Sequence, residues 1–189
     1  FCELYAGGKY GGDGDNYEYS LGLNGLGSCA TQYASEFFDA TIWRDGFKYS
    51  LHFEKGENQT GTKTGFKKKK YDGKDTGTMI RWRPDLEVFT DISIPESYYL
   101  DVLKRQAVVN PHLKFIFRNQ TETGFTTTEF CYENGITDYV AEIAEDRALT
   151  SIQSLSGERR GRDRADKPEY KVRLNCAFCF SSSVSRLEY

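Results

Sequence analysis

Several residue types and patterns that define large protein classes are scarce in this sequence. Its 189 residues include two histidines and a single methionine, Met79. No apolar run approaches the roughly 18 residues of a membrane-spanning helix, and nothing after Phe1 resembles a secretory signal peptide. We therefore expect no membrane partner and a cytoplasmic location. The start at Phe1 also predicts that these residues are a piece of a longer protein.

An excess of positive charge is missing as well. The 25 lysines and arginines are outnumbered by 28 acidic residues, which gives a net charge of −3. This balance disfavours a domain that binds nucleic acid over its whole surface. Two local basic segments remain, the lysine run 67–70 and the stretch "GERRGRDRADK" at 157–167. A solvated loop is the favoured interpretation of both, and contact with DNA phosphates is the alternative.

A disulfide framework is not indicated either. The cysteines are odd in number and scattered, as expected in a reducing cytosol: Cys2, Cys29, Cys131, Cys176 and Cys179. Cys176 and Cys179 have the C-x-x-C spacing of zinc and redox sites. However, the apolar alternation of residues 170–180 predicts a strand, on which an offset of three places the two thiols on opposite faces. Without a second C-x-x-C or a histidine pair, we predict no metal site.

Alternating apolar segments and amphipathic helical patterns predict an α+β fold. The clearest local signal is a hairpin, in which the turn Arg44-Asp45-Gly46 separates two alternating segments. Residues 56–75 are polar and predict an exposed loop or an irregular edge strand. Predicted strands cover 38–42, 47–53, 76–84, 112–119, 126–132, 150–156 and 169–181, and predicted helices cover 28–35, 96–110 and 136–147.

We expect these elements to pack as helices on one face of a largely antiparallel sheet. In this prediction residues 37–132 form one sheet, and the helices bury Tyr99, Val102, Leu103, Tyr139, Val140 and Ile143. The pattern of residues changes after Leu149, where two long predicted strands flank a charged loop. The sequence therefore predicts a boundary near residue 148, with domains 1–147 and 148–189.

The stretch "YEYSLGLNGLG" at 17–27 concentrates glycines before a predicted helix. Gly22, Gly25 and Gly27 would let backbone N–H groups approach an anion, and the start of a helix near Ser28 adds its positive dipole end. By itself, a G-x-x-G-x-G pattern favours a turn without a ligand. It lacks the Gly-Lys-Ser/Thr of a P-loop, and no strand leads into it as in a dinucleotide-binding fingerprint.

Four motifs in order carry a more specific resemblance: "GGKYGG", "YEYSLGLNGLG", "TGTMIRWRPDLEVF" and "NGITDYV". Together they resemble the ATPase subunits of bacterial type II DNA topoisomerases, the gyrase B and topoisomerase IV B family. That family has the Bergerat (GHKL) ATPase fold. The resemblance implies that residues 1–147 are the later part of a two-layer Bergerat ATPase domain, from the ATP lid onward. It also implies that residues 148–189 are the first β-hairpin of a transducer domain.

The resemblance implies a set of ATP-binding residues: Lys9, Tyr17, Gly22, Leu23, Asn24, Gly25, Leu26, Gly27 and Thr78. The amides of residues 22–27 would wrap the β- and γ-phosphates, with Lys9 close by. Tyr17 would contact the nucleoside, and Thr78 would be a buried threonine near the adenine. The alternatives are a solvated loop lysine for Lys9 and an ordinary strand residue for Thr78. For Tyr17, local sequence alone favours a core aromatic residue about equally.

The family's remaining catalytic groups are expected outside this sequence. The general-base Glu, the Mg²⁺-binding Asn and the adenine-reading Asp lie before the ATP lid in the family, and the transducer lysine lies after the residues given. We therefore assign no catalytic residue and no metal ligand, and expect these residues alone to be inactive. ATP and Mg²⁺ are the implied cofactors. The implied partners are DNA, the topoisomerase A-type subunit and a second copy of the B-type subunit.

Two alternatives stay open at this point. The sequence could be a non-catalytic interaction module from another Bergerat-fold ATPase, of the chaperone or mismatch-repair type. A small nucleic-acid-binding domain that uses the lysine run fits the negative net charge poorly. Asn24 stands where bacterial gyrases usually have His, which leaves gyrase versus topoisomerase IV undecided.

Overall fold

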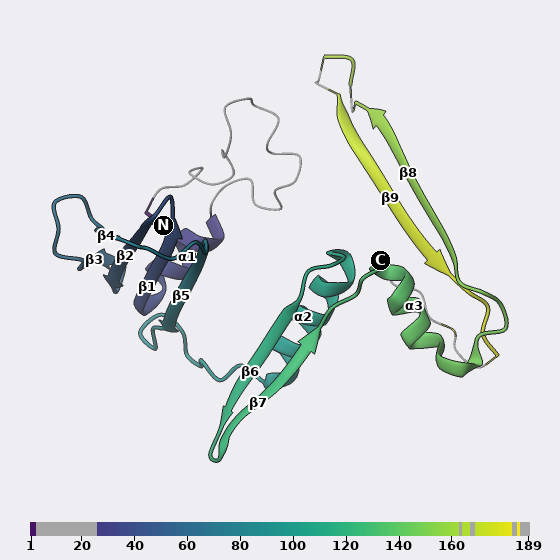
Figure 1. Ribbon diagram of the computed structural model, residues 1–189, viewed down its shortest axis with the longest axis horizontal. Helices are drawn as coiled ribbons and strands as arrows, with labels where there is room; N and C mark the ends of the chain where they lie inside the picture. The colour runs from purple at the N-terminus through teal and green to yellow at the C-terminus, as the bar shows by residue number, and fades with distance from the viewer. Residues whose placement is uncertain (3–25, 163, 167–168, 183–184, 186–189) are drawn as a thin grey trace. The chain divides into compact units, whose positions relative to one another are not determined.

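The computed structural model describes residues 1–2, 26–162, 164–166, 169–182 and 185 (Figure 1). The chain divides into two compact units, Phe1–Ser93 and Ile94–Tyr189. All strand pairings in the described parts are antiparallel, and helices accompany them in both units. The predicted α+β class is therefore confirmed. The predicted boundary near residue 148 stays a prediction.

The first unit is a five-stranded sheet with one short helix. Its elements are α1 (Leu26–Tyr33), β1 (Ser35–Arg44), β2 (Phe47–Glu54), β3 (Glu57–Asn58), β4 (Lys67–Lys70) and β5 (Gly77–Pro84). The strand order is β3-β2-β1-β5, and β4 also pairs with β2. The helix predicted to follow the glycines is confirmed, and it starts two residues earlier than predicted. The lysine run forms an exposed edge strand, one of the two predicted possibilities.

The β1–β2 hairpin confirms the predicted turn. Arg44 pairs with Phe47 across a two-residue connection. Both connecting residues lie in the left-handed region, Asp45 at φ 54° and Gly46 at φ 73°. Such a turn matches the right-handed twist of its flanking strands, and Asp-Gly is a preferred pair for it. The turn therefore sets the register of the whole hairpin.

The core of this unit lies on one face of the sheet. Phe38, Ala40 and Phe53 are at most 2 % exposed. The ring of Phe1 packs on them, with its centroid 5.2 Å from that of Phe38. Since β-strand side chains alternate between faces, Asp39, which lies between Phe38 and Ala40, is on the opposite, more polar face. The same alternation, read from the sequence, predicted both strands.

The second unit contains two helices and two separate hairpins. Its elements are α2 (Glu96–Val109), β6 (Phe115–Thr121), β7 (Gly124–Phe130), α3 (Ile136–Ala144), the 3-10 turn η2 (Glu145–Arg147), β8 (Gln153–Gly161) and β9 (Tyr170–Phe178). Its small core contains Ala107, Val108 and Tyr132, where α2 packs beside the β6–β7 hairpin. Every predicted helix and strand of this unit is confirmed, with shifted ends. None of the described helices is long and apolar enough to cross a membrane.

Two packing predictions are wrong. Residues 37–132 do not form one sheet, because β6 and β7 pair only with each other in the described chain. None of the six helical side chains predicted to be buried is buried; Tyr99 is 39 % exposed and Val102 37 % exposed. Helical periodicity identifies the apolar face of a helix but not what covers it. Here a two-stranded hairpin covers α2, and it is too narrow to enclose that face.

Candidate functional site

The structure describes part of the predicted ATP site. Lys9, Tyr17, Gly22, Leu23, Asn24 and Gly25 lie outside the described residues. Leu26 and Gly27 form the start of α1, and Thr78 lies in β5. The geometry of the candidate site therefore rests on the first turn of α1 and on its attachment to the sheet.

The first turn of α1 is open to a ligand. Leu26, Gly27 and Ser28 are all exposed, and the turn contains no acidic residue. A Cβ atom added at Gly27 would meet no atom of the described residues within 4 Å. The first N–H groups of a helix have no partner within the helix and are the positive end of its dipole. These features suit a phosphate, because the turn is exposed and carries no carboxylate of its own that would repel an anion.

The other end of α1 is fixed to the sheet. The Ser35 hydroxyl, at the start of β1, donates to the Thr31 carbonyl at 2.5 Å. The N–H of Asp85, directly after β5, donates to the Ala34 carbonyl at 3.0 Å. Cys29 and Gln32 are buried beneath the helix. The sheet therefore holds α1 in place, so that its first turn has a defined position.

Thr78 is not in the environment that the resemblance implies. It pairs with Ile42, near the far end of β1 from α1, roughly 23 Å along the strand from Ser35. Its side chain is exposed rather than buried. The physical reason is that β5 is the last strand of the described sheet, so only β1 flanks it. Thr78 is therefore exposed among the described residues, and its contact with the adenine stays a prediction.

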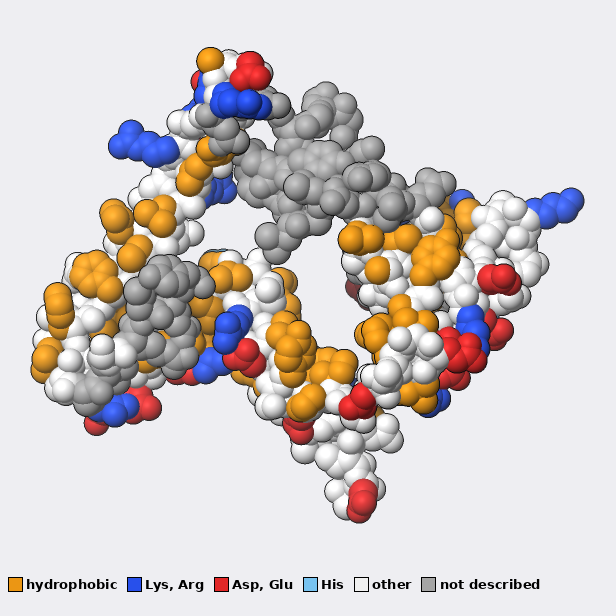
Figure 2. Space-filling model, turned by 180° about the vertical axis from the view of Figure 1, so that it is seen from behind, with side chains coloured by type: hydrophobic (Ala, Val, Ile, Leu, Met, Phe, Trp, Pro, Cys, Tyr) orange, Lys and Arg blue, Asp and Glu red, His pale blue; other side chains and the backbone are white. Residues whose placement is uncertain are grey.

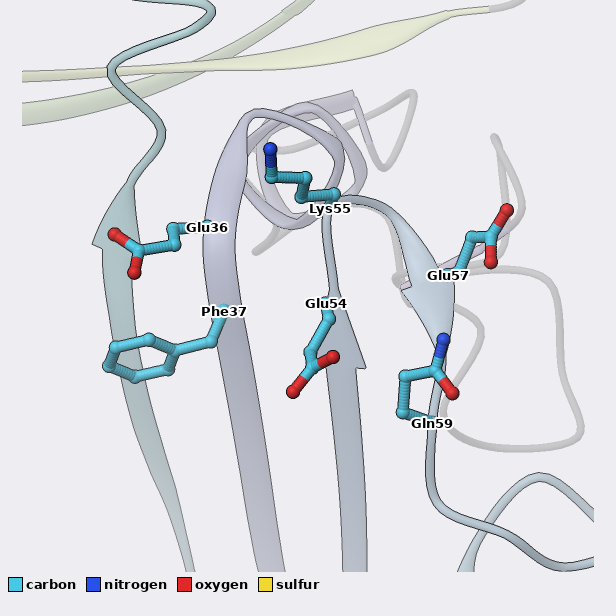
Figure 3. Close-up of a pocket in the computed structure, with 6 residues that line it drawn as sticks. All are labelled: Glu36, Phe37, Glu54, Lys55, Glu57 and Gln59. Atoms are coloured by element: carbon cyan, nitrogen blue, oxygen red, sulfur yellow. The ribbon is translucent and has the colours of Figure 1, made fainter.

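An open hollow of about 570 Å³ lies elsewhere in the same unit (Figure 3). Six residues line it: Glu36, Phe37, Glu54, Lys55, Glu57 and Gln59. The Lys55 ammonium already pairs with Glu87 at 2.7 Å, and this hydrogen bond raises the pKa of Lys55. The lining of the hollow therefore contains carboxylates, and its one lysine is already in an ion pair. That charge repels phosphate groups, so the hollow is not a second nucleotide site.

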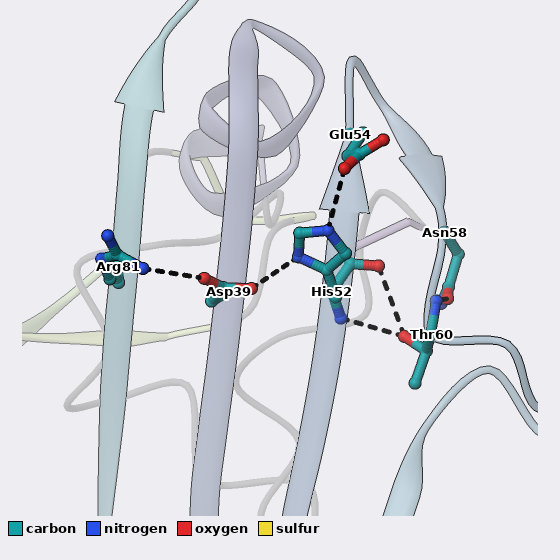
Figure 4. A network of polar contacts seen from close by, with 6 residues as sticks. All are labelled: Asp39, His52, Glu54, Asn58, Thr60 and Arg81. Carbon is teal, nitrogen blue, oxygen red and sulfur yellow. Dashed lines mark hydrogen bonds and ion pairs between the residues drawn. The ribbon is translucent and has the colours of Figure 1, made fainter.

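A polar network crosses three strands on the face opposite the core (Figure 4). His52 contacts Asp39 through Nδ1 at 2.6 Å and Glu54 through Nε2 at 3.3 Å, and Arg81 reaches Asp39 at 3.8 Å. The hydrogen bond with Asp39, followed by that with Glu54, raises the pKa of His52. We predicted no such network. The Asp45-Gly46 turn was a usable signal, because a two-residue turn there places residue 39 opposite residue 52.

The network also fixes the loop between β3 and β4. The backbone N–H of His52 donates to the Thr60 hydroxyl at 2.9 Å, and that hydroxyl donates to the His52 carbonyl at 3.3 Å. Thr60 is 4 % exposed. Among the described residues no cluster of three or more His, Cys, Asp or Glu side chains could hold a metal ion. The network therefore connects strands, and we assign it no catalysis.

The cysteines of the C-x-x-C pattern have no partner sulfur. All five cysteines are free. Cys176 lies exposed in β9, and Cys179 follows the end of that strand and is half-buried. Cys176 thus lies in the predicted strand, whereas Cys179 lies just past its end and not on its opposite face as predicted.

The sequence and fold were compared with known proteins. No family model matches the sequence. It is 30 % identical to the gyrase B protein of Chlamydia muridarum over 98 % of this chain and 22 % of that protein. It is 33 % identical to the topoisomerase 4 B protein of Escherichia coli over 75 % of this chain and 21 % of that protein. The chain thus spans about a fifth of the length of these relatives.

A solved structure shows the same fold. It is the 43K ATPase domain of Thermus thermophilus gyrase B, crystallised in complex with an aminocoumarin. The match has a TM-score of 0.59 and 21 % sequence identity, and covers 74 % of this chain and 36 % of that chain. Relatives of both kinds match about equally well, so gyrase and topoisomerase IV are not distinguished. Over its matched length, the chain belongs to the family of DNA gyrase B and topoisomerase IV B proteins.

Proposed function

We propose that the chain is part of an ATP-dependent type II DNA topoisomerase, in the subunit that binds and hydrolyses ATP. The relatives named as DNA gyrase and topoisomerase 4 subunits, and the fold of an ATPase domain, support this assignment. ATP binding would close the protein around DNA, and hydrolysis would drive the passage of one DNA segment through another. The subunit would act in the cytoplasm, with the A-type subunit and a second copy of itself.

The nucleotide site of this proposal is built around the start of α1. The amides of Gly22 to Gly27 would hold the β- and γ-phosphates, Lys9 would lie beside them, Tyr17 would contact the nucleoside and Thr78 the adenine. The single observation that carries this proposal is that α1 begins at Leu26, directly after the glycines, with an exposed first turn free of carboxylates. Backbone N–H groups in such a position stabilise negative charge that develops on transferring phosphates.

Magnesium would neutralise charge on the bound phosphates. The described residues contain no cluster that could ligate it. The proposal therefore places its ligands in other parts of the protein. The role of this chain is then to bind and orient the phosphates rather than to activate water.

Two glycine substitutions in the full-length protein test the site. Gly25→Val should lower the affinity for a non-hydrolysable ATP analogue at least tenfold, about 1.4 kcal/mol, because its side chain blocks backbone approach to phosphate. Gly27→Ala should also weaken nucleotide binding. However, it should not weaken the fold, because a Cβ there meets no atom of the described residues and alanine favours helix by up to about 1 kcal/mol. Calorimetry and thermal unfolding measure the two effects separately.

Gly157→Ala provides the matched control. Gly157 lies in β8, and a Cβ added there also meets no atom within 4 Å. This variant should bind nucleotide as the unchanged protein does. If Gly25→Val and Gly27→Ala both bound nucleotide normally, the phosphates would not lie at the start of α1, and the proposed site would be wrong.

A further inference from the structure

Three lysines lie together on one face of the first unit. Strand β4 pairs antiparallel with the first half of β2, so that Lys69 lies directly opposite Lys48 and Lys67 opposite Ser50. Since strand side chains alternate, these three lysines share the face opposite the core, while Lys68 and Lys70 lie on the other face. We call Lys48, Lys67 and Lys69 the lysine face.

The lysine face is electrostatically unfavourable by itself. Like charges directly opposite each other on neighbouring strands destabilise a sheet, and Lys48 and Lys69 are such a pair. In the described part of the chain no carboxylate forms an ion pair with any of the three. A conflict of this kind marks a candidate functional surface, because an anion placed between the ammonium groups would remove the repulsion.

The two lysines on the other face differ from the lysine face. Lys68 sits over the rings of Phe47 and Tyr49, with its Nζ 3.8 Å from the first centroid and 5.5 Å from the second. Lys70 pairs with Asp72 at 3.7 Å. Both ammonium groups therefore already have partners within the unit. The lysines of the run 67–70 that have neither an ion pair nor a ring contact within the described residues therefore lie on one face of the sheet.

Neighbouring aromatic residues support the lysine face. The Lys48 ammonium lies 5.5 Å from the centre of the Trp43 ring, and Tyr71 packs 6.4 Å from that ring. Lys48 is half-buried, whereas Lys67 and Lys69 are exposed. The cation–π contact and the strand backbone limit the freedom of this cluster, so less conformational freedom is lost when an anionic partner binds.

We propose that the lysine face binds the phosphate backbone of duplex DNA, which deepens and rests on the proposed function. Lys67 and Lys69 are two positions apart on one strand, about 6.7 Å. Successive phosphates of one DNA strand are also about 6–7 Å apart in space, because the backbone winds around the axis while it rises about 3.4 Å per nucleotide. Lysines at this interval on a strand match the fixed phosphate spacing of a duplex, whereas a flexible acidic peptide has no such fixed repeat.

The test uses the full-length protein and a fluorescently labelled duplex of arbitrary sequence, with anisotropy measured over a series of salt concentrations. In the triple variant Lys48→Gln, Lys67→Gln, Lys69→Gln the slope of log affinity against log salt should fall by roughly 2.7, because each lost phosphate contact removes about 0.9. The loss should be the same for unrelated duplex sequences. The double variant of the two exposed lysines covers the case that the triple variant does not fold, and its slope should fall by roughly 1.8.

The matched control replaces three lysines that already pair with carboxylates. Lys55, Lys104 and Lys114 contact Glu87, Glu142 and Glu129 respectively. Their triple change to Gln alters the net charge equally but should move the slope by less than about one. A slope that falls equally in both triple variants would overturn the proposal, since net charge alone would then explain DNA binding.

Two further measurements distinguish a failure of the DNA assignment from a failure of the proposed nucleotide site. If poly-glutamate of equal charge displaced the duplex from the unchanged protein as effectively as unlabelled duplex did, the DNA assignment would be overturned. ATP-analogue binding should be unchanged in both triple variants, because none of the six lysines replaced belongs to the proposed nucleotide site. If the unchanged protein bound no nucleotide while the slope fell as expected, the proposed function would fail and the DNA contact would stand.

Discussion

The two ends of the described chain have similar β-hairpins with very different burial. The β1–β2 hairpin lies within a five-stranded sheet and holds Phe38 and Phe53 at no more than 2 % exposure. The β8–β9 hairpin pairs with no other strand among the described residues, and its apolar side chains are visible along it (Figure 2). Each of these is at least 46 % exposed: Leu155, Tyr170, Val172, Leu174 and Phe178.

Alternation of apolar and polar residues alone does not create a buried core. Both hairpins have the period-two pattern that predicts strands, and both form strands. The first has further strands and α1 against it, whereas the second has α3 beside β9 but no further strand among the described residues. A two-stranded ribbon is by itself marginally stable in water. Apolar side chains therefore contribute to stability in the first hairpin far more than in the second.

The largest expected effect comes from truncating one apolar side chain in each hairpin. Phe38→Ala should lower the free energy of unfolding of the first unit by about 3–5 kcal/mol, because it leaves a cavity in a closed core. Leu174→Ala, at a side chain that is 60 % exposed, should cost less than about 1 kcal/mol. Urea unfolding followed by the fluorescence of Trp43 and Trp82, both in the first unit, measures the first effect.

Amide hydrogen exchange measures the second effect in the β8–β9 hairpin itself. The unchanged protein should exchange faster there than in β1 and β2, and Leu174→Ala should change this little. Equal protection of the two hairpins would contradict the comparison. It would mean that the apolar face of the second hairpin is covered in solution.

A smaller effect, of opposite sign in the two units, concerns buried polar groups. Gln32 in α1 is fully buried, and within the described residues neither atom of its amide head has a hydrogen-bond partner. Tyr132 in the second unit is also buried, but its hydroxyl donates to Glu142 at 2.5 Å, and burial with this bond raises the pKa of the phenol. An unpaired buried group destabilises a fold, whereas a paired one stabilises it.

Removing each polar group should therefore change stability in opposite directions. Gln32→Met keeps the volume and removes an unsatisfied amide, so it should stabilise the first unit by about 1 kcal/mol. Tyr132→Phe should destabilise the second unit by about 1 kcal/mol, because the hydrogen bond to Glu142 is lost. Thermal unfolding of each variant decides the signs. A destabilising Gln32→Met would show that the amide has a partner in solution, and the contrast would disappear.

The sequence was sufficient for local structure because local signals are strong. The Asp45-Gly46 turn and the alternation around it predicted the first hairpin, and the helical pattern starting at Ile136 predicted α3. The charged segment 157–161 was predicted as loop but belongs to β8. Its charges are compatible with a strand because the ribbon is exposed and Glu158 pairs with Arg173 across it at 2.8 Å.

The sequence was insufficient wherever the outcome depends on distant contacts. The extent of each sheet, and the exposure of Thr78 at its edge, depend on which strands become neighbours. The periodicity of a sequence does not indicate which strands these are. The candidate site was partly predictable, since glycines before a helix suggested an anion site and α1 does begin there. The cross-strand pair of Lys48 and Lys69 follows only from the β2–β4 register.

The smallest expected effect is a dependence on pH confined to the first unit. Hydrogen bonds with Asp39 and Glu54 raise the pKa of His52 above its ordinary value of 6.5. When the folded pKa exceeds the unfolded one, the protonated form stabilises the fold. The contribution is complete below about pH 6.5 and is lost as the pH rises through the folded value.

The first unit should therefore be more stable at about pH 6 than at about pH 9. The His52 side chain is 39 % exposed, so solvent screening limits the difference to roughly 0.5 kcal/mol. His52→Gln should flatten the dependence measured by the fluorescence of Trp43 and Trp82. His112→Gln, in the second unit, should leave it intact. A dependence that persists in His52→Gln would have another titrating group as its source, and the contrast between the units would then not involve the network around Asp39.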